Sequence, residues 1–417
     1  MRRVTTIAWT VALTLSAAAC GSGGPPHEVS TELPSREREK PRFTVVPLVR
    51  PALAGPDSVT AGAADETSED AAGPVLVAGP PVPSPEAVAA ARNVYAATLS
   101  GDLSPAVAGI TPRVYVPNSD GGTVSVIDPA TLEVVDRFAV GDVPHHVTPS
   151  WDLTELYVNN TESNTFTVID PRSGRPTGEI PVIDPYNLYF TLDGSKAIVV
   201  AERLQRLDFR DPNTWELIKS VDIPWAGADH LDFSADGRYL MVSTEFTGKL
   251  AKVDVERMEL VGAVEVGALP IDVKVSPDGA VFFVANQGRH GVSIVDPEAM
   301  TEIGFLPTGR GAHGLNYSRD TKTLFVSNRL AGTISLIDVA SRTVRDTWDV
   351  GGSPDMIQIN GDGTQLWVSN RFNASVSVVD TTTGRLVKAI PTGAGAHGVS
   401  FFPVPGRYNV GHNRVYR

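Results

Sequence analysis

The chain repeats itself with a period of 42 residues, and this repeat constrains the fold more than any other feature. Clear copies of the unit are VYVPNSDGGTVSVIDP from Val114, FFVANQGRHGVSIVDP from Phe282 and LFVSNRLAGTISLIDV from Leu324. In each copy, the residue that ends the first strand of the quoted segment lies 42 residues after its equivalent in the previous copy. These residues are Asn118, Asn160, Glu202, Thr244, Asn286, Asn328 and Asn370. The aspartates that end the next strand keep the same period, except for steps of 41 and 43 on either side of Asp211. Repeats of about 40–45 residues are typical of β-propeller blades.

Each unit is predicted to form four short strands. Apolar residues alternate with small or polar ones, as in Thr123–Val126, and turns such as Ser276–Gly279 separate the strands. The seventh unit is split, with three strands in Arg113–Val140 and the innermost strand in His397–Pro403. Such a closure removes open sheet edges. We therefore predict an all-β, seven-bladed propeller over residues 111–417, with four-stranded blades and the first blade closed by the C-terminal strand. The six complete units begin near Gly141, Ile183, Trp225, Gly267, Gly309 and Gly351.

The segments LYVNN, FVANQ, FVSNR and WVSNR, each followed by a strand like TVSVID, carry a family resemblance. They resemble the YVTN repeats of bacterial surface-layer and YncE-like β-propellers, over about residues 113–417. Lactonase-like proteins and the haem-binding propeller of dihaem nitrite reductases are related to this family. The resemblance therefore implies the fold and leaves the activity open.

The N-terminus is predicted to be a lipoprotein signal peptide, residues 1–20. Arg2 and Arg3 precede an apolar run, and small residues lead to Cys20, which is the only cysteine in the chain. This junction resembles a bacterial lipobox, which implies lipidation of Cys20 and a protein anchored outside the cytoplasm. The apolar run is too short to be a stable transmembrane helix, so the lipid is the expected membrane contact.

Two segments are expected between the signal peptide and the propeller. Residues 21–84 are rich in Pro, Ala, Gly and Ser without apolar periodicity, which predicts a disordered tether. Residues 85–110 are predicted to be a short helical lead-in. The formal net charge of −13 disfavours a nucleic-acid partner, because phosphate binding requires clustered Lys and Arg.

Several ionisable residues recur where the innermost strands begin. One column of the repeat holds His145, Asn187, Asp229, Ile271, His313, Asp355 and His397, and the next column holds His146 and His230. The loop between the second and third strands opens on the same face, and it carries Arg203, Arg329 and Arg371. We expect these side chains to converge at one mouth of the central channel.

Three interpretations of this face remain open. The residues could be structural or solvent-lining, since polar side chains entering a strand often bond the backbone. The guanidiniums could hold a small anionic ligand. A third possibility is a divalent metal held by His145, His313, His397 and Asp355, because imidazoles with carboxylate partners suit such ions.

The function predicted first is a monomeric surface module that binds a small anion or another envelope protein. The alternative is a propeller enzyme, oxidoreductase- or lactonase-like, with a metal or haem-type cofactor on the same face. A third hypothesis is an interaction protein that contacts another envelope protein through its blade rims and binds nothing in the central channel. Motifs for covalent haem, a Walker loop and a Gly-x-Ser-x-Gly elbow are absent from the sequence.

Overall fold

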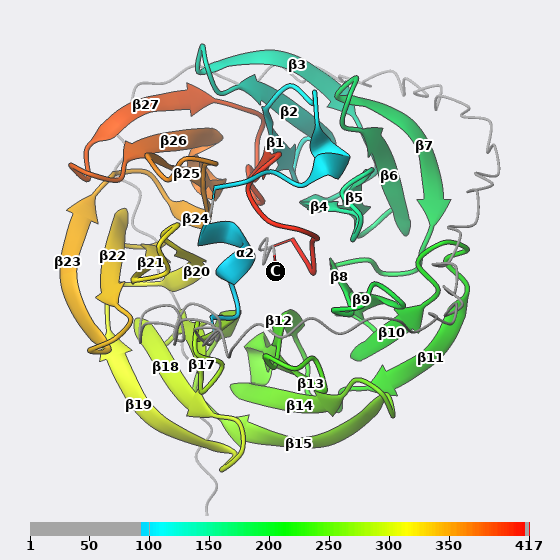
Figure 1. The fold of residues 1–417 in the computed structure, drawn as a ribbon, viewed down its shortest axis with the longest axis vertical. Helices are drawn as coiled ribbons and strands as arrows, with labels where there is room; N and C mark the ends of the chain where they lie inside the picture. Colours follow the sequence, from blue (N-terminus) through cyan, green and yellow to red (C-terminus); the bar gives the residue numbers. More distant parts are fainter. Residues whose placement is uncertain (1–92, 100, 413–416) are drawn as a thin grey trace, which may run out of the picture. The chain divides into compact units, whose positions relative to one another are not determined.

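The computed structural model describes residues 93–99, 101–412 and 417. Its strands form seven four-stranded antiparallel sheets that surround a central axis, as Figure 1 shows. The seven-bladed all-β propeller predicted from the repeat is therefore confirmed. The innermost strands are β28 (Ser400–Phe402), β4 (Pro144–Pro149), β8 (Asn187–Phe190), β12 (Ala228–Phe233), β16 (Pro270–Val275), β20 (Ala312–Tyr317) and β24 (Pro354–Ile359).

Burial falls from the axis to the rim. The innermost strands are buried at every position, whereas exposed residues alternate with half-buried ones along outer strands such as β3 (Glu133–Ala139).

The second strands are β1 (Arg113–Asn118), β5 (Leu156–Asn160), β9 (Ala197–Ala201), β13 (Tyr239–Thr244), β17 (Phe282–Asn286), β21 (Thr323–Asn328) and β25 (Gln365–Asn370). The third strands are β2 (Thr123–Asp128), β6 (Thr165–Asp170), β10 (Arg206–Arg210), β14 (Lys249–Asp254), β18 (Gly291–Asp296), β22 (Thr333–Asp338) and β26 (Ser375–Asp380). The other outer strands are β7 (Arg175–Pro181), β11 (Leu217–Asp222), β15 (Glu259–Glu265), β19 (Thr301–Pro307), β23 (Thr343–Asp349) and β27 (Leu386–Pro391).

The first blade joins the two ends of the propeller. Strand β28 pairs antiparallel with β1, and Arg113, Val114 and Tyr115 face Phe402, Phe401 and Ser400. Phe402 is 1% exposed and packs in the apolar cluster that contains Tyr115 and Val147. Its burial contributes roughly 1.5–3 kcal/mol to closure of the ring.

The repeated asparagines fasten the second strand of a blade to the third. Asn118 donates through Nδ2 to Thr123 Oγ1 and to Ser125 Oγ, both at 3.0 Å. Asn328 makes the same pair of bonds with Thr333 and Ser335. These side chains are buried and satisfied, which gives the asparagine column a structural role.

The third blade departs from the strict period by one residue. Its inner turn closes with Thr191 N bonded to Lys196 O, 41 residues after the equivalent bond of Ser150 N to Glu155 O. Strand β9 accordingly ends at Ala201, so the predicted strand end at Glu202 is wrong. The same offset puts Tyr186, rather than Asn187, in the column of His145.

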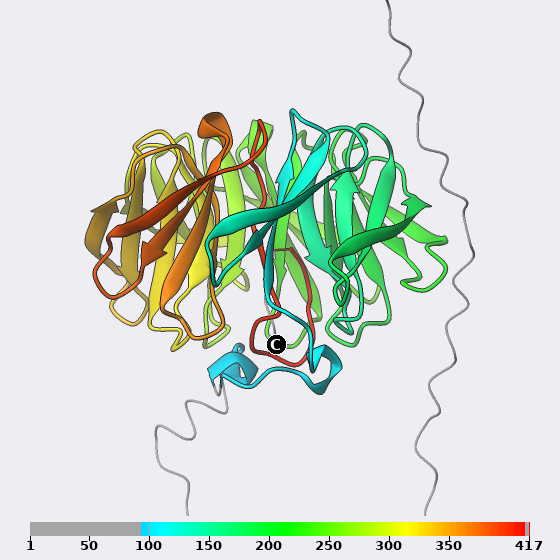
Figure 2. The same cartoon turned by 90° about the horizontal axis from the view of Figure 1, so that it is seen from above.

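Short helical turns precede the first strand. They are α2 (Ala96–Leu99) and η1 (Pro105–Val107), and two more, η2 (Glu245–Thr247) and η3 (Arg371–Asn373), follow second strands. Figure 2 shows α2 at one end of the ring, beyond the ends of the inner strands. The predicted signal peptide, the tether and residues 85–92 of the lead-in lie outside the described residues.

Candidate functional site

The predicted polar column gathers at the axis, at the end of the ring where the inner strands begin. His145, His313, Asp355 and His397 are 8%, 3%, 0% and 1% exposed. Together with Arg329 and Arg371 we call them the axial cluster. Buried charge of this kind is stable only when it is paired or hydrogen-bonded.

Asp355 is the centre of the axial cluster. Arg329 donates to its Oδ1 through Nε at 3.0 Å and through Nη2, and His313 Nδ1 lies 3.0 Å from the same oxygen. Arg329 Nη1 also donates to Gln287 Oε1 at 3.1 Å. Burial opposes ionisation of Asp355, but Arg329 and His313 outweigh it and hold the pKa of the carboxyl well below its usual range.

Two further imidazoles lie beside this ion pair. His397 Nδ1 donates to the backbone oxygen of His145 at 3.1 Å, so its Nε2 faces Asp355 Oδ2, 3.8 Å away. His145 bonds Thr161 Oγ1 through Nδ1 at 2.8 Å. Burial, followed by the charge of Arg371, lowers the pKa of His145 to about 4 and that of His397 well below its usual value. Both imidazoles are therefore neutral at pH 7.

The three predicted arginines occupy different environments. Arg329 is bound to Asp355, as above. Arg203 lies one position further along its loop because of the offset in the third blade, and it bonds Asp184 Oδ1 at 2.8 Å and Glu162 Oε2 at 3.0 Å. Arg371 is half-buried, and its guanidinium makes no hydrogen bond or ion pair with any residue that the structure describes.

Sequence reasoning missed three residues at this end of the axis. Tyr186 packs on His145 with ring centroids 4.8 Å apart. Glu202 and Glu245 follow second strands, as Arg329 and Arg371 do, but in the third and fourth blades. Burial, followed by the nearby charge of Asp229, raises the pKa of each glutamate to about 7. The uneven steps of 41 and 43 residues around Asp211 were the sequence signal that the third blade is offset by one residue.

The axial cluster fits a metal ion poorly. Ligand atoms of His313, Asp355 and His397 lie within 4.8 Å of one another, which is close enough for a shared ion. However, Arg329 bonds both His313 Nε2 and Asp355 Oδ1. The guanidinium therefore occupies the Nε2 lone pair of His313 and one carboxylate oxygen, and it would repel a second positive charge; only Asp355 Oδ2 is left without a hydrogen bond to a described residue.

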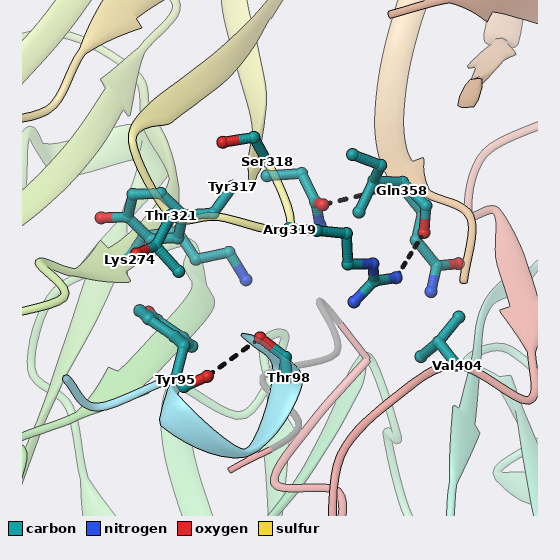
Figure 3. Close-up of a pocket in the computed structure, with 11 residues that line it drawn as sticks. Tyr95, Thr98, Lys274, Tyr317, Ser318, Arg319, Thr321, Gln358 and Val404 are labelled. Carbon is teal, nitrogen blue, oxygen red and sulfur yellow. Dashed lines mark hydrogen bonds between the residues drawn. The ribbon is translucent and has the colours of Figure 1, made fainter. Parts of the chain in front are cut away.

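Two hollows lie at the α2 end of the ring, an open one of about 560 Å³ between α2, η1 and Arg407 and a small one beneath α2. A cavity of about 40 Å³ under α2 is lined by Tyr95, Lys274, Arg319 and their neighbours (Figure 3). Tyr95 Oη donates across it to Val275 O at 2.9 Å. The volume suits a few water molecules, whereas ligand pockets usually enclose about 300–1,000 Å³.

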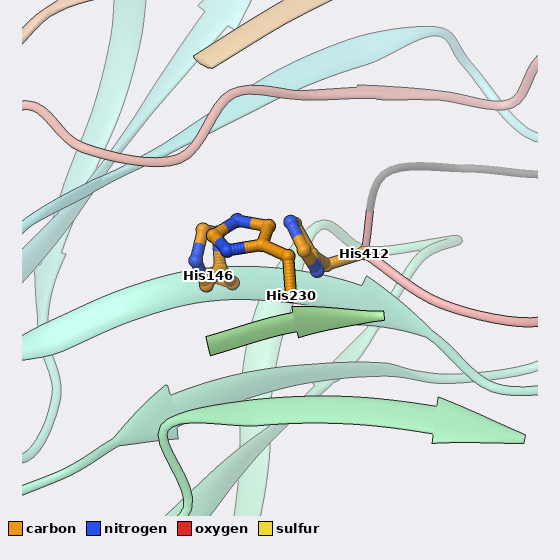
Figure 4. Close-up of side chains that lie close together, drawn as sticks. All are labelled: His146, His230 and His412. Carbon is orange, nitrogen blue, oxygen red and sulfur yellow. The ribbon is translucent and has the colours of Figure 1, made fainter. Parts of the chain in front are cut away.

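The second polar column forms a separate group of buried imidazoles. His146 and His230 come together with His412, a residue of the C-terminal tail that the repeat did not reveal (Figure 4). We call these three residues the histidine trio. His146 also packs on His397, with ring centroids 4.8 Å apart, so the trio adjoins the axial cluster.

Among the described residues, no helix is long and apolar enough to cross a membrane. No curated protein matches the chain significantly.

Comparison with solved structures shows the same fold in proteins of different kinds. The hydrazine synthase of Kuenenia stuttgartiensis is 19% identical with a TM-score of 0.53, over 60% of this chain and 87% of that one. A functionally unknown protein from Desulfotomaculum acetoxidans is 17% identical with a TM-score of 0.61, over 69% and 98%. NirN, a dihydro-heme d1 dehydrogenase in complex with DHE, is 17% identical with a TM-score of 0.54, over 70% and 76%. At these identities the likeness concerns the fold alone. The profile of the YNCE-like beta-propeller family matches residues 86–404, and the chain belongs to that family.

Proposed function

We propose that this propeller is a binding module that takes a small anionic ligand at the axial cluster, with Arg371 as the charged anchor. The observation that carries the proposal is the half-buried guanidinium of Arg371, which pairs with no described residue and whose charge acts on His145 and His397. Arg329 differs, because its charge is balanced by Asp355. A guanidinium with free donors at a partly desolvated site suits a carboxylate or phosphate.

The rest of the cluster supports the same proposal. His397 donates its one N–H to the backbone oxygen of His145, so Arg371 and not this imidazole would supply the hydrogen bonds to the anion. Glu202 and Glu245 have pKa values of about 7, so they carry only part of their negative charge at neutral pH. A metal or haem-type cofactor on this face has less support, because Arg329 bonds the imidazole and carboxylate that would bind it.

The sequence adds a proposed location. The lipobox-like junction at Cys20 favours a lipid-anchored protein on the outer side of the cytoplasmic membrane. The module would then meet ligands or envelope proteins outside the cytoplasm.

Calorimetric titration with inorganic phosphate tests the anion site. Arg371→Met should weaken phosphate binding roughly 10–100-fold, because a hydrogen bond to a charged group contributes about 1.5–3 kcal/mol. Arg385→Met is the matched control, since Arg385 carries the same charge in the same blade but is exposed on its outer side. Equal affinity in the wild type and Arg371→Met, or equal losses in both variants, would contradict the proposal.

A further inference from the structure

The tail that follows the closing strand lies against the innermost strand of the third blade. Phe190 N donates to Val410 O at 3.0 Å, and Gly411 forms an antiparallel bridge with Tyr189. Asn409 Nδ2 donates to Pro149 O at 2.7 Å. These bonds hold the tail at the axis, where the red trace of Figure 1 ends, and they place His412 among residues of other blades.

The histidine trio is compact and buried. His146, His230 and His412 are 1%, 0% and 6% exposed. The ring of His412 lies 3.9 Å from that of His146 and 4.7 Å from that of His230, measured between centroids. One ring nitrogen from each residue lies within 4.8 Å of the others, and Figure 4 shows the three rings facing one another.

These imidazoles have polar atoms without partners. His146 Nε2, His230 Nε2 and both ring nitrogens of His412 are buried and make no hydrogen bond with any residue that the structure describes. Buried polar groups in native proteins are almost always satisfied, so four such nitrogens in one place require an explanation. Three imidazole nitrogens this close together form a donor set that zinc accepts.

A carboxylate beside the trio favours a cation, although the buried ammonium of Lys274 also acts on it. His230 Nδ1 lies 2.5 Å from Asp229 Oδ1, which leaves Nε2 as the free donor atom. A carboxylate that orients a histidine in this way is the usual outer partner of a zinc ligand. Among the residues that the structure describes, no arginine donates to the trio, in contrast to the axial cluster.

We propose that His146, His230 and His412 bind one Zn²⁺ ion, with the C-terminal tail supplying the third ligand. Tetrahedral Zn–N bonds of about 2.05 Å place the ligand nitrogens about 3.4 Å apart, so small ring movements from the present separations complete the site. Three protein ligands leave the fourth position for a water or another small ligand. This site is distinct from the anion site at Arg371 and does not depend on it.

Zinc titration of the purified full-length chain, first stripped with a chelator, tests the proposal. A chromogenic competitor measures affinity and stoichiometry, and visible absorption of the Co²⁺ form reports coordination geometry. We expect one Zn²⁺ per chain and a four-coordinate cobalt spectrum. His412→Ala should weaken binding by more than the roughly 10–100-fold expected for Asp229→Asn, which removes only the outer partner.

Two control variants locate the metal. His290→Ala removes an exposed histidine and should leave zinc affinity unchanged. His313→Ala removes an imidazole of the axial cluster and should leave most of the affinity in place. The proposal is overturned if the wild type binds no zinc, if His412→Ala binds it normally, or if His313→Ala abolishes binding while His412→Ala does not. Phosphate titration of His412→Ala distinguishes this outcome from failure of the anion site, because Arg371 is untouched.

Discussion

Replacement of Arg329 by methionine tests whether charge pairing holds the axial cluster together. Asp355 is fully buried, and Arg329 is its main partner, with Nε at 3.0 Å from Oδ1. Arg329→Met removes the guanidinium and leaves the carboxylate without a cation in direct contact. Arg371→Met is the matched control, because it removes an equal charge that pairs with no described residue.

The size of the effect follows from this geometry. Two unit charges about 4 Å apart attract by about 4 kcal/mol at an effective dielectric constant of about 20. Breaking a buried pair by removing one partner typically costs about 3–5 kcal/mol. We therefore expect Arg329→Met to lower the free energy of unfolding by about 3–5 kcal/mol. The double variant Arg329→Met/Asp355→Asn should recover roughly 2–3 kcal/mol of this loss, because neither charge remains.

Guanidinium unfolding followed by tryptophan fluorescence measures these differences, and acid adds a second test. In the wild type the depressed pKa of Asp355 stabilises the fold above pH about 4, and this contribution is lost as pH falls below that value. In Arg329→Met only His313 and the charge of Arg371 still oppose burial, so the pKa of Asp355 should rise relative to the wild type, and the stability difference between the two proteins should narrow as pH falls. The reasoning is refuted if Arg329→Met costs no more than Arg371→Met, or if the single and double variants lose equal stability.

Three further predictions concern closure, pH and location. Truncation after Thr392 removes β28 and should destabilise the ring by more than the roughly 3–5 kcal/mol expected for loss of a buried Phe402 side chain, measured by thermal melting; an unchanged melt would contradict the closure. Affinity for sulfate, whose own charge is constant between pH 6 and 8, should fall over that range, because Glu202 and Glu245 ionise near pH 7 and add negative charge; calorimetry showing the opposite slope would contradict this. Cys20→Ala should release the protein from the membrane or leave an unprocessed precursor, and a membrane-bound, normally cleaved variant would count against lipidation.

The fold was largely predictable because the number of repeat units in the sequence equals the number of blades in a propeller. The repeat gave the number of blades, and the split unit located the closing strand opposite Arg113–Val140. The error lay in the third blade, where a constant step of 42 assigned Glu202 to the end of a strand. The turn between the first two strands of a blade, rather than a constant step, fixes the register. The 41-residue step to Asp211 already indicated the one-residue offset of the third blade.

The site was predictable only where it follows the repeat. His145, His313, Asp355 and His397 converge because equivalent positions of neighbouring blades meet at the axis. Arg329 pairs with Asp355, whereas Arg371 forms no ion pair with a described residue. This difference depends on side-chain conformations, which the spacing of the repeat does not encode. His412 belongs to a tail without a repeat partner, so no periodic signal indicated that it reaches His146 and His230.

The position of β1 has a mechanical consequence. It is an interior strand, with five residue pairs to β2 on one side and three to β28 on the other. Tension applied to the chain before Arg113, along the direction of the strand, would load both ladders at once in shear. An edge strand could instead be peeled away one hydrogen bond at a time. A pull from the N-terminus would first have to release Val94 and Tyr95 from Pro277 and Val275, and would then load the β28 ladder, the shorter of the two.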